Sequence, residues 1–212
     1  VKMMNEPNGI ILVTGATGTG KSTTLYSILQ KLNTEEVNII TVEDPVEMDI
    51  AGINQVQTQT EIGLTFANVL RSILRQDPDI ILVGEIRDKE TGEIAIQAGQ
   101  TGHYVLSTIH TIDAVEVITR LRKMGLQDYD IASTLATSIS QRLVRKLCPK
   151  CRKERDFTTD EIEKINAIGK RYNVQFDLKG KKTYDAIGCK YCNNTGYYDR
   201  IGIFEILDIT DD

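Results

Sequence analysis

Long apolar runs are missing from this sequence of 212 residues. A membrane-spanning helix needs about 20 consecutive, mainly apolar residues, and no segment approaches that length. No signal peptide is visible, and there is no internal repeat or low-complexity segment. These absences predict a cytoplasmic protein whose contact with a membrane, if it has one, is peripheral.

An excess of positive charge is missing as well. The chain has 25 lysines and arginines against 30 aspartates and glutamates, which gives a net charge of −5. Proteins that coat nucleic acids neutralise phosphates with many basic side chains, so this balance argues against that class, although it leaves room for a local basic patch. The 41% apolar and 26% charged residues are ordinary for a soluble globular protein. The length allows one core with a small satellite subdomain.

The clearest feature that is present is a phosphate-binding loop. Residues 15–22 read GATGTGKS and follow the apolar run 10–13, which is the strand-then-helix setting that the G-x-x-x-x-G-K-[ST] motif requires. Glycines let the backbone adopt positive φ and approach phosphate oxygens closely. Inward-facing N–H groups and a helix N-terminus then bind the anion. The motif predicts a nucleoside triphosphate site; a glycine-rich turn that merely joins two elements is the alternative.

Two residues of this loop have predicted roles of their own. Lys21 is expected to reach the β- and γ-phosphates as a point charge, and Ser22 to offer its hydroxyl to Mg²⁺. Because Mg²⁺ keeps several waters, one hydroxyl plus phosphate oxygens is sufficient. The full predicted nucleotide-binding set is Gly15, Ala16, Thr17, Gly18, Thr19, Gly20, Lys21, Ser22 and Thr23.

Strand-like and helix-like segments alternate along the chain, which predicts an α/β fold with a largely parallel sheet. The expected strands are short continuous apolar runs, as in sheets covered on both faces. They are 10–14, 38–43, 80–85 and 104–109. The expected helices are 21–33, 65–76, 89–99, 113–124 and 129–145.

The composition changes after residue 145, where cysteines and lysines become frequent and aliphatic runs rare. We therefore predict a nucleotide-binding core at 1–145, a metal-held subdomain at 146–195 and a returning strand segment at 196–212. A strand begins within ten residues of Val1, and the sequence stops just after a strand-like run. We expect that sequence is missing at both ends.

Hydrolysis of a nucleotide also needs a group that orients water and groups that stabilise charge. The apolar strand 80–83 is followed by Gly84, where an aspartate is usual, and then by Glu85. Because strand ends of an open parallel sheet face the ligand crevice, Glu85 is the leading candidate to align or deprotonate the attacking water. A surface salt bridge between Glu85 and Arg87 is the alternative.

Further polar candidates lie at the ends of two other strands. Glu43 ends the apolar run 38–42 and would lie near the γ-phosphate or Mg²⁺, unless its Glu-Asp-Pro run only starts a turn. His110, which follows the strand 104–109 on the ligand side, is predicted to contact the γ-phosphate. His103 stands at the other end of that strand and is the weaker candidate.

Four segments in this order form a recognisable set: GATGTGKS, ITVEDPVE at 40–47, DPDIILVGEIRD at 77–88 and TGHYVLSTIHT at 101–111. The set resembles the secretion ATPase superfamily, whose members power type IV pili and type II secretion. CPKC at 148–151, GCKYC at 188–192 and TGYYDRIGIFEIL at 195–207 narrow the resemblance to the C-terminal domain of pilus-assembly and type II secretion ATPases. It covers nearly the whole chain.

This resemblance implies a RecA-like domain that hydrolyses ATP with Mg²⁺ and works in a ring-shaped homo-hexamer. It also implies an N-terminal domain, absent here, that supplies further arginines to the nucleotide. An inner-membrane platform protein of the pilus or secretion machine is the implied partner, which places the protein at the cytoplasmic side of that membrane.

The resemblance also assigns residues by motif. Lys21 and Ser22 hold the phosphates and Mg²⁺, Glu43 belongs to an acidic box, Glu85 is the catalytic acid and His110 belongs to a histidine box. A glycine in place of the usual aspartate before the catalytic acid is tolerated in the family. Three arginines match family arginines without an assigned role: Arg71, Arg75 and Arg87.

The four cysteines form two C-x₂-C pairs, Cys148 with Cys151 and Cys189 with Cys192. Four thiolates of this kind form a closed tetrahedral Zn²⁺ site. No histidine or open position accompanies them, which favours structural over catalytic zinc. Disulfides are disfavoured because the chain is predicted to be cytoplasmic, and iron–sulfur ligation is a further alternative.

Seven basic residues fall in 142–155. Because Zn²⁺ with four thiolates carries a charge of −2, we interpret them as compensation, with a partner-docking surface as the alternative. No nucleic acid is expected as a partner.

The predicted function is an ATP-driven hexameric motor for pilus assembly or type II secretion, slow as an isolated domain, and both of these roles remain open at this point. A pilus-retraction ATPase is an alternative, disfavoured because the tetracysteine insertion marks the extension and secretion branch. A DNA-uptake or other nucleic-acid motor that uses the basic, zinc-binding segment is another.

Overall fold

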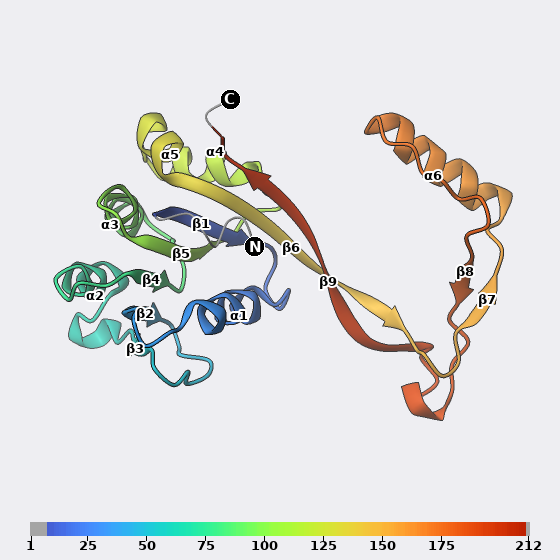
Figure 1. Ribbon diagram of the computed structural model, residues 1–212, viewed down its shortest axis with the longest axis horizontal. Helices are drawn as coiled ribbons and strands as arrows, with labels where there is room; N and C mark the ends of the chain where they lie inside the picture. Colours follow the sequence, from blue (N-terminus) through green and yellow to red (C-terminus); the bar gives the residue numbers. More distant parts are fainter. Residues whose placement is uncertain (1–7, 211–212) are drawn as a thin grey trace. The chain divides into compact units, whose positions relative to one another are not determined.

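The apolar runs of the sequence become the strands of a seven-stranded sheet with the order β3-β2-β4-β5-β1-β6-β9. The computed structural model describes residues 8–210. All the neighbouring pairs from β3 to β6 are parallel, whereas β6 and β9 run in opposite directions (Figure 1). The strands are β1 Gly9–Thr14, β2 Ile39–Glu43, β3 Asn54–Gln57, β4 Ile80–Val83, β5 Tyr104–Ile109, β6 Leu135–Leu147 and β9 Tyr197–Asp208.

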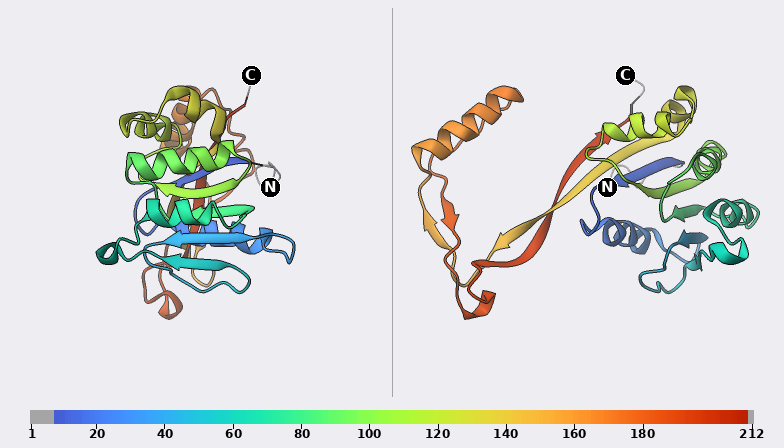
Figure 2. Two further views of the ribbon diagram at one scale, coloured as in Figure 1. Left: turned by 90° about the vertical axis from the view of Figure 1, so that its left-hand side faces the viewer. Right: turned by 180° about the vertical axis from the view of Figure 1, so that it is seen from behind.

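Helices cover both faces of this sheet (Figures 1 and 2). They are α1 Lys21–Leu32, α2 Phe66–Ile73, α3 Lys89–Gln100, α4 Glu116–Lys123 and α5 Asp128–Thr134, with a short 3₁₀ turn η2 at Thr60–Ile62. Successive strand residues point to opposite faces. Ile11 therefore packs with the α1 side of the core, whereas Ile10 packs with the side covered by α2, α3, α4 and α5. The predicted α/β class with a mostly parallel sheet is confirmed.

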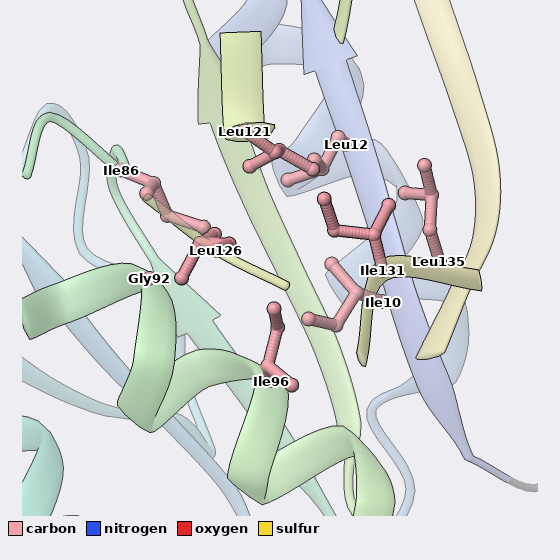
Figure 3. A pocket seen from close by; sticks show the side chains of 9 residues that line it. All are labelled: Ile10, Leu12, Ile86, Gly92, Ile96, Leu121, Leu126, Ile131 and Leu135. Atoms are coloured by element: carbon pink, nitrogen blue, oxygen red, sulfur yellow. The ribbon is translucent and has the colours of Figure 1, made fainter. Parts of the chain in front are cut away.

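A small apolar cavity lies in the core on the side of α3, α4 and α5 (Figure 3). Its lining offers no charged or hydrogen-bonding side chain, so it reflects imperfect packing and has no means of binding a polar ligand. The lining residues are Ile10, Leu12, Ile86, Gly92, Ile96, Leu121, Leu126, Ile131 and Leu135.

The prediction of a helix over 129–145 is wrong beyond residue 134. The helix α5 ends at Thr134, and Leu135 begins the long strand β6, which pairs with β1 so that Ile139 lies beside Val13. Residues 137–141 are all buried, and β-branched Thr137 and Ile139 suit a pleated surface that is covered by its neighbours. Tertiary pairing thus decides the structure of this segment.

The strand β3 is not among the strands predicted from the sequence. Its sequence, Asn-Gln-Val-Gln, is polar, and its two end residues are exposed. It forms the edge of the sheet and pairs in parallel with β2, Val56 lying beside Val42. An edge strand of this kind lacks the apolar run by which the buried strands are recognised.

Compact packing divides the described residues into two units, 8–142 with 202–210 and 143–201. The second unit contains the antiparallel strands β7 Lys153–Arg155 and β8 Thr183–Asp185, the helix α6 Thr159–Arg171 and the 3₁₀ turn η3 Lys190–Cys192. Thr158 and Glu161 form a capping box at the start of α6. Hydrogen bonds from Arg155 lower the pKa of Glu161 to about 2.

Among residues 8–210, no helix is both long and apolar enough to cross a membrane.

Candidate active site and metal centre

The loop between β1 and α1 has the backbone form that its glycines allow. Gly20 has φ of 87°, a left-handed conformation that favours glycine. A Cβ atom on Gly15 would lie 2.4 Å from the carbonyl oxygen of Gln141, so no side chain fits there. The loop therefore passes closely over β6 before α1 begins at Lys21.

The ammonium group of Lys21 lies within this loop. Its Nζ donates to the carbonyl oxygens of Gly15 at 2.9 Å and Ala16 at 3.2 Å. Burial lowers the pKa of Lys21, while the negative charge of Glu85 acts in the opposite direction. Ser22 and Thr23 follow in the first turn of α1, and both are exposed. Lys21 thus combines contact with the loop and electrostatic interaction with the predicted acid.

Glu85 and His110 come together at the ends of two adjacent strands, β4 and β5. The His110 Nε2 atom lies 3.8 Å from Glu85 Oε2, and Arg87 forms an ion pair of 2.5 Å with Glu85 Oε1. The Glu85 side chain is only 12% exposed. Among the described residues, its buried Oε2 has no hydrogen-bond partner. This oxygen is a free acceptor beside an imidazole and near an ammonium, a setting suited to orienting a water molecule.

Glu43 has a different environment, buried between α1 and the sheet. Its carboxylate accepts hydrogen bonds from the hydroxyls of Tyr26 and Thr41 and from the amide of Gln55. Burial and the bond to Glu43 raise the pKa of Tyr26 to about 12. None of these partners is Lys21, Glu85 or His110, so Glu43 belongs to a separate network that joins α1 to β2.

The backbone explains the glycine that precedes Glu85. A Cβ atom on Gly84 would lie 3.3 Å from both the Cα of Glu43 and the carbonyl oxygen of Val42. This is tighter than ordinary van der Waals contact, so an aspartate would require β2 to give way by a few tenths of an ångström. The close approach of β2 and β4 therefore accounts for the departure from the usual aspartate.

His103 lies at the amino end of β5, opposite the phosphate-binding loop. Its Nδ1 atom is 3.0 Å from the carbonyl oxygen of Ala98 and 3.2 Å from Thr101 Oγ1. Its own carbonyl accepts from Gly9 N–H at 3.2 Å, at the start of β1. Because β1 and β5 are parallel, His103 lies at the amino ends of these strands, away from the loop. Its side chain contacts the last turn of α3.

The three arginines without an assigned role are not gathered in one place. Arg71 on α2 pairs with Glu90 on α3 at 2.7 Å, and both side chains are about half exposed or more. Arg75 is exposed just after α2. Only Arg87 contacts the predicted catalytic acid.

Two residues outside the sequence motifs, Thr14 and Gln141, form hydrogen bonds beside or to the loop. Thr14, at the end of β1, exchanges hydrogen bonds with Thr111, the residue after His110. Gln141 on β6 donates to the carbonyl of Thr19 at 2.7 Å and accepts from the hydroxyl of Thr24 at 2.7 Å. Gln141 lies in the segment predicted as helix, and only its assignment to a strand beside β1 could have placed it here.

The four cysteines converge in the second unit. Their sulfur atoms all lie within 4.8 Å of one another, and three of the pairs are 3.8 to 4.0 Å apart. None is in a disulfide, whose sulfurs would be about 2.05 Å apart. A tetrahedral Zn²⁺ site with bonds of about 2.3 Å places its sulfurs about 3.8 Å apart, so the cluster fits this ion.

Backbone donors support the sulfur cluster. The N–H groups of Cys189 and Gly196 point at the Cys192 Sγ at 3.2 and 3.3 Å. Burial raises the pKa of the Cys192 thiol, but these N–H groups and the neighbouring thiols outweigh that effect and bring it to about 6. The unit thus provides stabilisation for a thiolate before any metal is considered.

Comparison with known proteins settles the family. The whole chain, residues 1–212, matches the model of a family described as Type II/IV secretion system protein. The chain belongs to this family. The resemblance of the motifs GATGTGKS and VEDP to this family is therefore confirmed.

Relatives within the family are longer than this chain. Type II secretion system ATPase E of Vibrio cholerae is 52% identical over 213 residues, which cover 99% of this chain and 40% of the relative. Type IV pilus assembly ATPase PilB of Myxococcus xanthus is 49% identical over 209 residues, which cover 98% of this chain and 36% of the relative. The chain spans about two fifths of the length of these proteins.

Two solved structures have a similar fold. The ATPase DotB of Legionella pneumophila matches with a TM-score of 0.65 and 27% identity, over 99% of this chain and 48% of DotB. The pilus retraction motor PilT, solved with bound ADP, matches with a TM-score of 0.62 and 34% identity, over 81% of this chain and 55% of PilT. The α/β architecture is therefore that of the family.

Proposed function

We propose that this chain is the ATP-hydrolysing domain of a motor for type IV pilus assembly or type II secretion. The observation that carries the proposal is the meeting of Lys21, Glu85 and His110 around the phosphate-binding loop. Membership of the secretion system family supports it. An ammonium for the phosphates and a buried free carboxylate oxygen for a water are two of the groups that phosphoanhydride hydrolysis requires.

In the proposed mechanism the backbone N–H groups of residues 15–20 and the start of α1 bind the phosphates. Lys21 contacts the β- and γ-phosphates, and Ser22 provides a hydroxyl for Mg²⁺, which supplies charge neutralisation when bound. Glu85 Oε2 accepts a hydrogen bond from the attacking water and takes its proton, while the water oxygen bonds to the γ-phosphorus and the bond from that phosphorus to the leaving ADP breaks. His110 donates a hydrogen bond to a γ-phosphate oxygen. Glu43 acts through the position of α1, since its carboxylate is already engaged.

We further propose that the four cysteines hold structural Zn²⁺, and that 1–145 acts as the ATPase core, 146–195 as the zinc subdomain and 196–212 as the returning strand segment. Four sulfurs leave no ligand position for a reacting water, so the metal would stabilise the fold of its unit. The spacing of the sulfurs and the N–H donors at Cys192 support this proposal.

The proposed assembly is a homo-hexamer on the cytoplasmic side of the inner membrane, in contact with a platform protein of the pilus or secretion machine. Sequence outside this chain would complete the nucleotide site with further arginines, so the isolated chain should turn over slowly. The matches to type II secretion and pilus assembly ATPases, at 52% and 49% identity, favour these roles over retraction, since PilT is 34% identical.

Replacing Lys21 with alanine tests the proposed function. We expect the Kd for the magnesium complex of a non-hydrolysable ATP analogue to rise about ten- to a hundredfold, because a hydrogen bond to a charged group contributes about 1.5–3 kcal/mol. Isothermal titration calorimetry measures this Kd. The matched control is Lys31→Ala, which removes an exposed lysine from the last turn of the same helix and should keep the wild-type Kd.

Two results would contradict this proposal at different levels. An unchanged Kd in Lys21→Ala would show that the ammonium does not contact the phosphates. Absence of any binding heat with the wild-type chain would remove the nucleotide site altogether.

A further inference from the structure

Gln141 is a buried polar residue that the proposed chemistry does not use. It lies on β6, which pairs with β1, and it is 4% exposed. Both ends of its amide are engaged at 2.7 Å, the Nε2 atom by the carbonyl oxygen of Thr19 and the Oε1 atom by the hydroxyl of Thr24. The first of these groups belongs to the phosphate-binding loop and the second to α1.

The chemistry of the two partners fixes the orientation of this amide. A carbonyl oxygen can only accept, so the NH₂ end of Gln141 must face Thr19. The Oε1 end then faces the hydroxyl of Thr24, which donates. Glutamate has no donor for the carbonyl of Thr19, and methionine satisfies neither group. Of these three side chains, only glutamine meets both requirements.

The two partners of Gln141 lie on either side, along the sequence, of the residues that are proposed to hold the phosphates and Mg²⁺. Thr19 and Thr24 flank Lys21 and Ser22 in the sequence. The bond to the Thr19 carbonyl holds the Thr19–Gly20 peptide, and with it the direction of the Gly20 N–H. A Cβ atom on Gly20 would lie 3.0 Å from Gln141 Nε2, so the amide packs directly against the turn. Gln141 therefore controls the shape of the loop immediately before the helix.

We infer that Gln141 is a positioning residue for the phosphate-binding loop, which it holds in its nucleotide-binding form by joining Thr19 to Thr24. The inference rests on the proposed function, since it concerns binding of the phosphates of a nucleotide. A loop held in its binding form avoids the loss of conformational entropy that a free loop would suffer on binding.

The test compares nucleotide affinity with stability in Gln141→Met, which has a similar size but makes neither bond. We expect its Kd for Mg·ADP, measured by calorimetry, to rise about tenfold, the effect of one lost hydrogen bond to a part-buried carbonyl. The thermal unfolding temperature without nucleotide is measured in parallel. Gln141→Glu should weaken binding further, because its carboxylate would face the Thr19 carbonyl and add negative charge beside the phosphates.

A matched control separates positioning from simple stability. Thr137 lies on the same strand beside Ile11 of β1, is 2% exposed and donates to Asp208 at 3.0 Å. Thr137→Val should lower the unfolding temperature and keep the wild-type Kd. Thr24→Val removes the other bond of Gln141 and should weaken Mg·ADP binding. Combined with Gln141→Met, it should weaken binding by less than the product of the two single effects.

Each outcome decides the inference. If Gln141→Met binds Mg·ADP with the wild-type Kd, the positioning role of Gln141 is wrong, whatever the unfolding temperature of the variant. The proposed function would then remain intact. If Gln141→Met does not fold, the Kd of Thr24→Val decides in the same way. Failure of the wild-type chain to bind Mg·ADP would remove the proposed function, and this inference with it.

Discussion

Glu85→Gln is expected to bind the magnesium complex of ATP with wild-type affinity and to lose at least about a hundredfold in kcat. The change keeps the size of the side chain and removes its capacity to take a proton, and a positioned general base contributes about 10²–10⁴ in rate. The buried Oε2 atom, with no hydrogen-bond partner among residues 8–210, is the acceptor that this prediction concerns. Phosphate release at saturating Mg·ATP measures kcat, and calorimetry measures affinity.

The matched control for this prediction is Glu93→Gln. Glu93 is an exposed carboxylate on α3 whose ion pair is with Lys89, so its loss should leave kcat unchanged. If Glu85→Gln hydrolysed ATP at the wild-type rate, another group would have to orient the water, and the assignment of Glu85 would be wrong. A fall in affinity without a fall in kcat would instead make Glu85 a binding residue.

Removal of the metal ligands should have the largest effect on stability. We expect the wild-type chain to contain about one Zn²⁺ and the double variant Cys189→Ser, Cys192→Ser to contain almost none. Structural zinc contributes about 10–16 kcal/mol to the folding of small zinc-binding peptides, far more than any single hydrogen bond. Elemental analysis measures the zinc, and hydrogen exchange should show loss of protection around the four cysteines.

Lys190→Ala is the control for the metal prediction, since its exposed side chain lies between two of the ligands and provides no sulfur. It should keep the zinc and the protection from exchange. Iron in the purified chain, with the absorbance of an iron–sulfur cluster, would contradict the prediction. Disulfides found by mass spectrometry in freshly purified protein would also contradict it.

The parts of the structure that the sequence predicts well are those set by local chemistry. The four buried strands of the core are continuous apolar runs, and glycine spacing with Lys21 and Ser22 marks the loop between β1 and α1. The approach of Glu85 to His110 was also foreseeable, because both follow strands that are parallel and adjacent. In these cases the local pattern and the tertiary structure favour the same conformation.

Long-range packing decides the parts that sequence reasoning missed. The segment 135–147 has no strong local preference, and it is a strand because β1 leaves an open edge for it. The role of Gln141 depends on that pairing and could not be inferred without it. Glu43 stands at the predicted strand end, yet its engagement by Tyr26 and Gln55 depends on how α1 and β3 pack around it.

The order of the strands has a consequence for how such a chain can evolve. Residues 143–201 leave the sheet by β6 and return by β9, and these two strands are neighbours that run in opposite directions (Figure 1). Adjacent antiparallel strands can be joined by a hairpin of a few residues. The unit 143–201 is therefore an insertion between the two strands of a hairpin. Evolution could shorten or exchange this unit while the strands that carry the proposed nucleotide-binding residues keep their neighbours.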